Sequence, residues 1–129
     1  KNKKINFKLI DITKDYLPRM DLMICRDCLF HLSYKDIKKF FLNYKKSKIK
    51  FIVINGNKNY YNKNESFNNK NIVSGDFRKI DFFSAPFNFK KNYELSFLDE
   101  DINDTKNSKY IYVFNMKKFL ENINNFKLY

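Results

Sequence analysis

Glycine is scarce in this sequence, which holds only Gly56 and Gly75 among its 129 residues. A nucleotide-binding α/β domain normally uses several glycines in its phosphate-binding turns and in tight corners between strands and helices. If the chain has that fold, its glycine-rich portion is therefore missing or substituted. Long apolar runs are missing too: no stretch approaches the roughly 18 consecutive apolar residues of a membrane span, and there is no signal-peptide hydrophobic region. These absences predict a soluble, cytoplasmic protein.

Cysteine is equally scarce, and Cys25 and Cys28 form a C-x-x-C with His31 shortly after it. A structural zinc site needs about four ligands of these kinds, whereas the chain has two cysteines and one histidine in total. A thioredoxin-like redox site would place its second cysteine at the start of a helix, but both cysteines here lie beside an apolar run of strand length. The sequence therefore favours buried, reduced thiols over a metal site or redox chemistry.

Arginine is rare among the 26 basic residues, since only Arg19, Arg26 and Arg78 are arginine. A net charge of +12 ordinarily indicates an anionic partner such as nucleic acid. The lysines, however, are scattered among asparagine, isoleucine, tyrosine and phenylalanine, a mixture that the codon bias of an AT-rich genome produces on tolerant surfaces. A basic module that binds single-stranded nucleic acid stays as an alternative, ranked lower because most aromatic residues fall at core spacing.

The pattern that is present is that of an α/β fold. Apolar runs at 21–25 and 49–55 flank a helix pattern with its N-cap at Ser33 and apolar residues at 37, 40, 41 and 44. Strand, helix and strand at this spacing form a βαβ unit, which implies parallel strands and a right-handed crossover. The first run is predicted to be a central strand covered on both faces. The dipeptide Asn55-Gly56 is predicted to end the second strand in a turn.

The rest of the chain is expected to be less regular. A further strand is predicted at 5–10, and the asparagine-rich residues 57–71 are predicted to form a flexible loop. Residues 73–89 carry Gly75 and Pro86 among aromatic residues, which is typical of an ordered but irregular segment. The runs 93–101 and 109–120 are predicted to be strands of an antiparallel hairpin at the sheet edge.

Two segments resemble class I S-adenosylmethionine-dependent methyltransferases. Residues 21–37, DLMICRDCLFHLSYKDI, resemble the fourth strand and following helix of a bacterial group whose sequences read D-L-[IM]-[IL]-C-R-D-x-L-x-H-L-S-x-x-D-I. Residues 71–89, NIVSGDFRKIDFFSAPFNF, are similar to that group's D-I-x-x-G-x-[WF]-R-x-[IL]-[DN]-x-x-x-x-P-F-x-[FL] segment. With the final hairpin, the resemblance spans nearly all of residues 1–129. It implies the C-terminal portion of a Rossmann-like domain, with parallel strands, a crossover helix and an antiparallel hairpin.

The departures from the family concern its cofactor-binding portion. The family's E-x-G-x-G-x-G turn, and the acidic residue that ends its second strand, have no counterpart here. The methionine and ribose contacts of S-adenosylmethionine would then come from upstream residues or from another subunit. Phe77 stands where tryptophan is usual, and Lys48-Ile49-Lys50 replaces the usual Pro-Gly. A chain without the complementary half would be a catalytically inert half-domain, which is the third hypothesis.

The resemblance also implies residue roles on the cofactor side. Asp11, followed by Ile12, would accept a hydrogen bond from the adenine amino group, and the backbone at Cys25, Arg26 and Asp27 would wall the cofactor near the transferred methyl. The structural alternatives are a surface-turn or capping role for Asp11, and an ion pair of Arg26 and Asp27 with each other or with a neighbouring loop.

On the acceptor side, His31 is the candidate general base for a hydroxyl or amine, with Arg26 and Asp27 as further catalytic candidates. The alternative for His31 is a packing or capping residue. The acceptor pocket would be lined by Asn71, Asp76, Arg78, Pro86 and Phe87. Methyl transfer depends mainly on positioning and requires neither a triad nor a metal, so no metal ligand is expected. Nothing in the sequence identifies the methyl acceptor.

Overall fold

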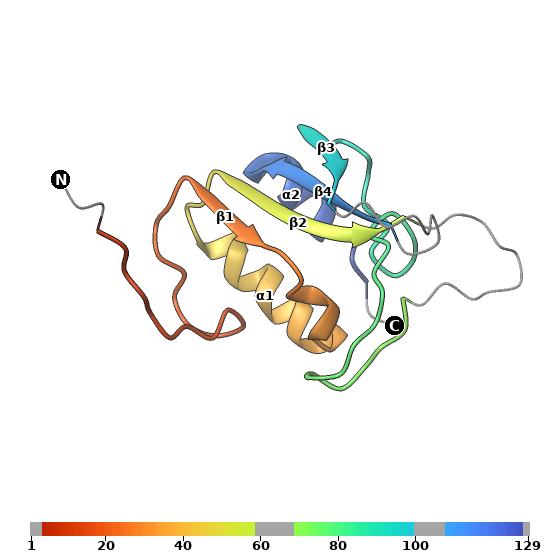
Figure 1. The fold of residues 1–129 in the computed structure, drawn as a ribbon, viewed down its shortest axis with the longest axis horizontal. Helices are drawn as coiled ribbons and strands as arrows, with labels where there is room; N and C mark the ends of the chain where they lie inside the picture. The colour runs from red at the N-terminus through yellow and green to blue at the C-terminus, as the bar shows by residue number, and fades with distance from the viewer. Residues whose placement is uncertain (1–3, 59–68, 100–107, 128–129) are drawn as a thin grey trace, which may run out of the picture.

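The computed structural model describes residues 4–58, 69–99 and 108–127. These residues form a mixed α/β fold with one four-stranded sheet (Figure 1). In chain order the elements are β1 (Leu22–Cys25), the 3-10 helix η1 (Leu29–His31), α1 (Tyr34–Lys46), β2 (Phe51–Asn57), β3 (Leu95–Leu98), β4 (Lys109–Asn115) and α2 (Met116–Ile123). No helix in the described ranges is long and apolar enough to cross a bilayer.

The predicted βαβ unit is confirmed. Strand β1 pairs in parallel with β2, with Leu22 opposite Phe51, and α1 lies between them in the chain. Ser33 caps α1, because its hydroxyl accepts a hydrogen bond from the Asp36 N–H at 3.2 Å. The apolar stripe of α1 is buried as its spacing predicts; its members are Ile37, Phe40, Phe41 and Tyr44.

The predicted antiparallel hairpin is confirmed as well, but its second strand is shorter than predicted. The sheet order is β1-β2-β4-β3, and β4 runs antiparallel to both of its neighbours. The prediction that the strand continues to residue 120 is wrong, because Asn115 caps α2 by accepting a hydrogen bond from the Lys118 N–H at 2.9 Å. Residues Met116, Phe119 and Ile123 then follow helical spacing.

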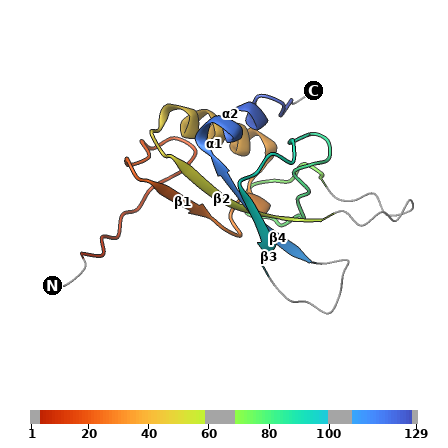
Figure 2. The same cartoon turned by 90° about the horizontal axis from the view of Figure 1, so that it is seen from above.

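Three other predictions about strands are wrong. Residues 5–10 are not in the sheet, and in Figures 1 and 2 they run away from it, with no strand of the described ranges beside them. Strand β1 is an edge strand rather than a central one. The pair Asn55-Gly56 does not end β2, because β4 pairs with β2 along its whole length as far as Asn57. Gly56 serves close packing instead, since an added Cβ would lie 2.9 Å from Phe82 Cδ2.

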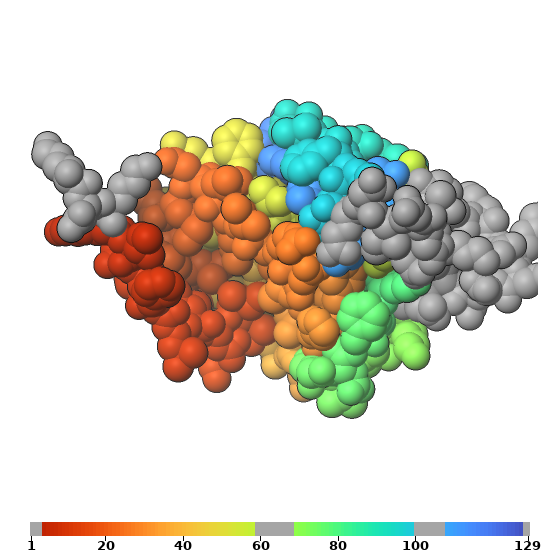
Figure 3. Space-filling view, viewed as in Figure 1, coloured from red at the N-terminus to blue at the C-terminus, as the bar shows by residue number. Residues whose placement is uncertain are grey.

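Among the described residues, one face of the sheet is covered and the other is open. In Figure 2 both α helices lie on the same side of the strands. Side chains alternate along a strand, and those facing the helices form the core, including Ile52, Ile54 and Phe114. The opposite face carries exposed apolar side chains and is seen from the front in Figure 3; its exposed members are Leu22, Ile24, Phe51, Leu95 and Phe97. The prediction that β1 is covered on both faces is therefore wrong for the described chain.

The irregular segment 73–89 is ordered, as predicted, and it packs against the start of α1. The Tyr34 N–H donates to Asn71 Oδ1 at 2.8 Å, and the Ser33 N–H donates to Ser74 Oγ at 2.9 Å. Farther along, the Phe87 ring stacks on Phe126 with centroids 4.8 Å apart. Most of the predicted loop at 57–71 lies outside the described residues, as do residues 100–107 of the predicted hairpin loop.

Candidate functional site

A pocket of about 440 Å³ lies where β1 and β2 end. Its walls come from the turn after β1, from η1, from the last residue of β2, from the segment after residue 75 and from the start of β4. The lining residues are Asp27, Phe30, His31, Asn57, Phe77, Lys79 and Lys109. In an open α/β sheet, ligands bind beyond the carboxyl ends of the parallel strands, so this pocket is the candidate site.

Backbone hydrogen bonds join the two sides of the pocket across a long sequence separation. The Gly75 N–H donates to the His31 carbonyl at 2.8 Å, and the Arg78 N–H donates to the Phe30 carbonyl at 3.1 Å. Gly75 has a φ of 106°, a conformation that glycine adopts without strain. These bonds place the Phe77 ring beside His31, with centroids 5.6 Å apart.

His31 has one ring nitrogen engaged by the opposite wall. Its Nδ1 lies 2.9 Å from the carbonyl oxygen of Asp76. A carbonyl oxygen can only accept, so this bond requires the proton on Nδ1 and leaves Nε2 of the neutral ring with a lone pair. His31 therefore has the tautomer that a general base needs, and it lies in the wall of the pocket.

Asp27 is held in place by Asn55 of β2. Asp27 has a φ of 52°, in the left-handed region that few residues other than glycine adopt. Asn55 Oδ1 accepts from the Asp27 N–H at 2.9 Å, and Asn55 Nδ2 donates to Asp27 Oδ1 at 2.7 Å. The strand thus fixes both the backbone and the carboxylate of the turn.

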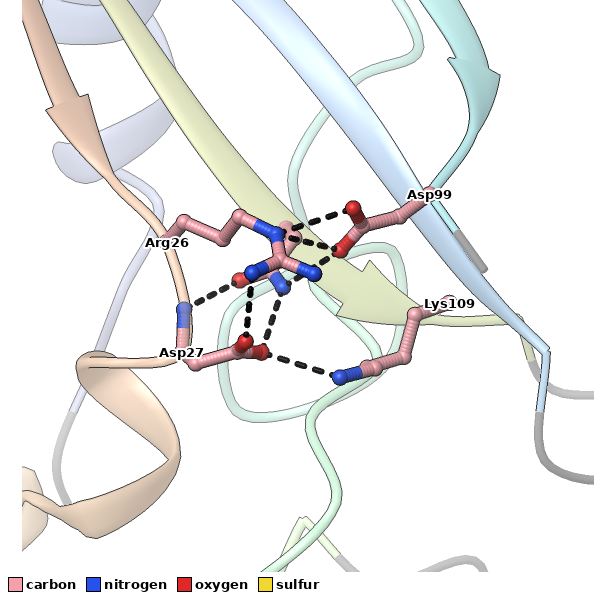
Figure 4. Close-up of polar contacts among 5 residues, drawn as sticks. Arg26, Asp27, Asp99 and Lys109 are labelled. Carbon is pink, nitrogen blue, oxygen red and sulfur yellow. Dashed lines mark hydrogen bonds and ion pairs between the residues drawn. The ribbon is translucent and has the colours of Figure 1, made fainter. Parts of the chain in front are cut away.

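Three further charged side chains, those of Arg26, Asp99 and Lys109, join this pair in one network (Figure 4). Arg26 Nε donates to Asp99 at 2.9 Å, and Arg26 Nη1 lies 3.2 Å from Asp27 Oδ2. Lys109 Nζ is 3.0 Å from Asp27 Oδ1. Burial raises the pKa of Asp27, but the hydrogen bonds from Asn55 and Lys109 outweigh it, so the net pKa is lowered. Arg26 and Asp27 therefore pair with each other and with a neighbouring loop, which is the structural alternative to their catalytic role.

Asp11 and Ile12 lie in a separate local turn. Asp11 Oδ1 accepts from the Thr13 N–H at 2.9 Å and from the Thr13 hydroxyl at 2.7 Å, while Oδ2 lies 3.3 Å from Lys14 Nζ. These hydrogen bonds with Thr13, followed by Lys14, lower the pKa of Asp11. The Ile12 carbonyl accepts from Asn43 Nδ2 of α1 at 2.9 Å. Asp11 therefore has the geometry of a surface-turn residue, which is the alternative to adenine binding.

None of the residues predicted to bind substrate is among the lining residues of this pocket. Phe87 is fully buried, and Arg78 is 2% exposed. Asn71 caps α1 and Asp76 offers its carbonyl to His31, as described above. Pro86 is half-buried. From this segment the lining residues are Phe77 and Lys79, the two neighbours of Arg78.

The sequence does not predict several residues of this candidate site. Asn55 looked like a turn signal, and the contributions of Asp99 and Lys109 depend on how the hairpin pairs with β2. Asn57 is 4% exposed, lines the pocket, and has an Oδ1 without a partner among the described residues. The one sequence pattern that could have indicated these residues is the pair of asparagines at alternate positions, 55 and 57, after an apolar run.

A second pocket of about 400 Å³ lies beside β3 and β4. Aromatic and basic side chains meet there: Lys58 Nζ lies 5.1 Å from the Tyr110 ring centroid, and Lys91 Nζ lies 5.6 Å from that of Phe83. Tyr112, also in its wall, is 4% exposed and packs edge-on against Phe83.

Comparisons with known proteins identify no relative: no family profile, no curated protein and no solved structure matches the chain. Among residues 4–58, 69–99 and 108–127 there is also no group of three or more His, Cys, Asp or Glu side chains that could hold a metal ion.

Proposed function

We propose that this chain forms the acceptor side of an S-adenosylmethionine-dependent methyltransferase site. The observation that carries the proposal is the meeting of the two segments, 21–37 and 71–89, that resemble the family. They are joined by the backbone bonds at Phe30 and His31 and together supply most of the wall of one pocket.

The topology supports the same proposal at the level of fold. The parallel pair β1 and β2, the connecting helix α1 and the antiparallel hairpin of β3 and β4 match the arrangement that the resemblance implies. The finer assignment, a partial Rossmann-like sheet, is part of the proposal. The position of the pocket beyond the carboxyl ends of β1 and β2 is the position such a sheet gives its ligands.

The open face of the sheet indicates that a further layer belongs to the site. Strands with apolar side chains on both faces are typical of sheets covered on both sides, and β1 places Leu22 and Ile24 on the uncovered face. An exposed apolar area of this kind marks an interaction surface. We propose that it receives the complementary half of the domain, carried by upstream residues or by another subunit.

The residues described here do not fit the whole cofactor. The Asp11 carboxylate is engaged by Thr13 and Lys14, Cys25 is buried, and Arg26 is paired with Asp99. The complementary half would therefore have to hold S-adenosylmethionine, which supplies an electrophilic methyl group when bound. The role of this chain is to orient the acceptor against Phe77 and Phe30 and to take its proton on His31 Nε2.

Calorimetry with S-adenosylmethionine tests the proposal, on this chain alone and on the complete product of its gene. We expect no binding to the chain alone and saturable binding to the complete product. Failure of the complete product to bind, including when mixed with candidate partner subunits, would sink the proposal. Binding without transfer of labelled methyl to any acceptor in a metabolite or macromolecule pool would favour the inert half-domain.

The role of His31 has its own test once an acceptor is found. The variant His31→Gln should lower kcat by about 10²- to 10⁴-fold and leave S-adenosylmethionine affinity unchanged. Lys35→Gln, on an exposed position of α1 outside the pocket, is the matched control and should leave kcat unchanged.

The second pocket favours one other function, binding of single-stranded nucleic acid. Its lysines and aromatic rings are the groups that contact phosphates and bases, and the chain carries a net charge of +12. If this function is correct, the affinity for a single-stranded RNA should fall steeply with salt. No measurable binding at low salt would exclude it.

A further inference from the structure

Two half-buried lysines from different segments lie in the wall of the pocket beyond β1 and β2. Lys79 belongs to the irregular segment after Gly75, and Lys109 is the first residue of β4. The side chain of Lys109 is 19% exposed. Burying part of an ammonium group is unfavourable unless polar or anionic partners replace its hydration. Two such groups in one wall therefore favour a ligand that carries negative charge.

Among the described residues that line the pocket, Asp27 supplies the only carboxylate. Its Oδ1 lies 3.0 Å from Lys109 Nζ, as Figure 4 shows, and its Oδ2 lies 3.2 Å from Arg26 Nη1. The negative charge of Asp27 is therefore already balanced by cations of this protein. With Lys79 included, the lining residues carry two positive charges and one negative charge, so the wall attracts an anion.

Asn57 adds a hydrogen-bond acceptor to the same wall. It is 4% exposed, and its Oδ1 has no partner among the described residues. A buried carbonyl oxygen without a donor is unfavourable, and a ligand with a hydroxyl or an amine would supply that donor. Asn57 follows Asn55 by two residues in β2, so the two side chains lie on the same face of the strand. The strand that fixes Asp27 thus also positions this oxygen.

We propose that the methyl acceptor is a small molecule that carries an oxyanion, phosphate or carboxylate, together with a hydroxyl or an amine. Lys79 and Lys109 bind the oxyanion, and Asn57 Oδ1 accepts a hydrogen bond from the acceptor. The body of the molecule lies against the Phe77 ring, which is 60% exposed and adjacent to His31. That this ligand is methylated rests on the proposed function, whereas its binding requires no cofactor.

An NMR titration of the complete gene product, without S-adenosylmethionine and at constant ionic strength, tests the oxyanion site. Inorganic phosphate and acetate are the probes. We expect one of them or both to shift the backbone amide signals of Phe77 and Asn57 saturably, while the signals of Lys35 and Lys46, exposed on α1, stay in place. The probe that saturates at the lower concentration identifies the oxyanion. No shift with either probe, or equal shifts at the α1 lysines, would overturn the proposal.

Variants of one lysine separate a built site from net charge. Lys79 is the better choice, because Lys109 also holds Asp27. Lys79→Gln should raise the dissociation constant of the better probe about 10-fold, and Lys79→Arg, which keeps the charge, should recover most of the affinity. Lys35→Gln makes the same change of charge on an exposed position and should have no effect. Equal losses in Lys79→Gln and Lys35→Gln would overturn the site. The wild-type titration decides the question if Lys79→Gln does not fold.

A matched pair of probes tests the contact with Asn57. Glycerol 3-phosphate and propyl phosphate differ only in the two hydroxyl groups of the glycerol; lactate and propionate serve in the same way if acetate is the better simple probe. We expect the hydroxylated member to bind more tightly and to shift the side-chain amide signals of Asn57. Equal affinities and no shift of these signals would overturn the role of Asn57.

The inference and the proposed function fail separately. Localised oxyanion binding by a complete product that does not bind S-adenosylmethionine would sink methyl transfer and keep the oxyanion site. Binding of S-adenosylmethionine by a product whose pocket signals respond to neither probe would sink the acceptor class alone.

Discussion

The side chain of Asn55 bonds Asp27 twice, once at the backbone N–H and once at the carboxylate. Asn55 lies in β2 and is 3% exposed, whereas Asp27 lies in the turn after β1 at φ 52°. A buried strand residue thus holds a neighbouring turn in a conformation that the turn alone would rarely adopt. Asn55 Nδ2 also donates to Asp99 at 2.9 Å, so the same side chain links three segments of the chain.

A double-mutant cycle should detect this coupling. Asn55→Ala and Asp27→Ala should each lower the free energy of unfolding by about 1–3 kcal/mol, because each removes hydrogen bonds between partly buried polar groups. The double variant should lose less than the sum, with a coupling of about 0.5–3 kcal/mol measured by urea denaturation. Asn43→Ala combined with Asp27→Ala is the control, and it should be additive because Asn43 bonds Ile12 and Asp15 instead. Additivity in the first pair would contradict the finding.

Gly56→Ala should destabilise the fold by about 1–3 kcal/mol through overpacking. An added Cβ would lie 2.9 Å from Phe82 Cδ2 and 3.1 Å from the Ile80 carbonyl oxygen. Phe82→Leu, introduced as a second change, should recover part of the loss in thermal unfolding. Gly75→Ala is the comparison: its site has open space but a φ of 106°, so Phe82→Leu should not relieve it. Equal effects of Phe82→Leu in both backgrounds would refute the packing explanation.

Arg78 presents a buried charge with few partners. Its Nη1 donates to the Leu32 carbonyl at 2.6 Å and its guanidinium lies 5.1 Å from the Tyr34 ring, while Nε and Nη2 have no partner among the described residues. Burial lowers the pKa of Arg78. Since a buried charge without a counter-charge is costly, Arg78→Met should change the free energy of unfolding by less than about 1 kcal/mol. Arg78→Ala should cost about 2–5 kcal/mol, because it leaves a cavity. If Met were as damaging as Ala, the guanidinium would have to be making an essential polar contact.

The reactivity of Cys28 should report its lowered pKa. We expect its alkylation rate by iodoacetamide to rise to half its maximum near pH 7, because the cited pKa is about 7. Cys25→Ser should move this midpoint, since the Cys25 hydrogen bond is the largest cause of the shift. A wild-type midpoint at the ordinary thiol value near 9 would contradict the hydrogen-bonded pair.

The shifted pKa values of Cys25 and Cys28 also predict how the free energy of unfolding depends on pH. Cys28 has a lowered pKa in the folded state. Its contribution to the free energy of unfolding is therefore fully present above the unfolded pKa of 9.0 and is lost as the pH falls through about 7. Cys25 has a raised pKa, so its contribution is present below 9.0 and is lost at higher pH. Comparing wild type with a Cys25→Ser, Cys28→Ser variant by urea denaturation should therefore show a wild-type advantage that grows from about pH 7 to 9 and then declines. A flat difference across that range would contradict the assignment.

The sequence predicted the parts of the fold that local patterns encode. The apolar stripe of α1 and its Ser33 cap fix the helix, and two apolar runs around it fix the parallel pair. Residues 5–10 alternate only loosely and form no strand, because a strand needs a neighbour and no strand of the described residues lies beside them. At Asn55-Gly56 a local turn signal was overridden by seven residues of pairing with β4.

The sequence located the segments of the candidate site but only some of the side chains that line it. His31 and Asp27 were expected and do line the pocket, since both follow a strand end that the sequence locates. Lys109 and Asn57 line it because of how the hairpin pairs with β2, a long-range relationship that no local pattern reveals. Asp99 joins the network for the same reason.

The melting temperature of this protein distinguishes two origins of the proposed layer over the open apolar face: another subunit, or another part of the same polypeptide. A layer that covers the face in the folded state only acts thermodynamically as a ligand, and at 100 times its dissociation constant it adds about 2.7 kcal/mol to the free energy of unfolding. If the layer is another subunit, the melting temperature rises with that subunit's concentration. If it is part of the same polypeptide, the melting temperature is the same at every dilution.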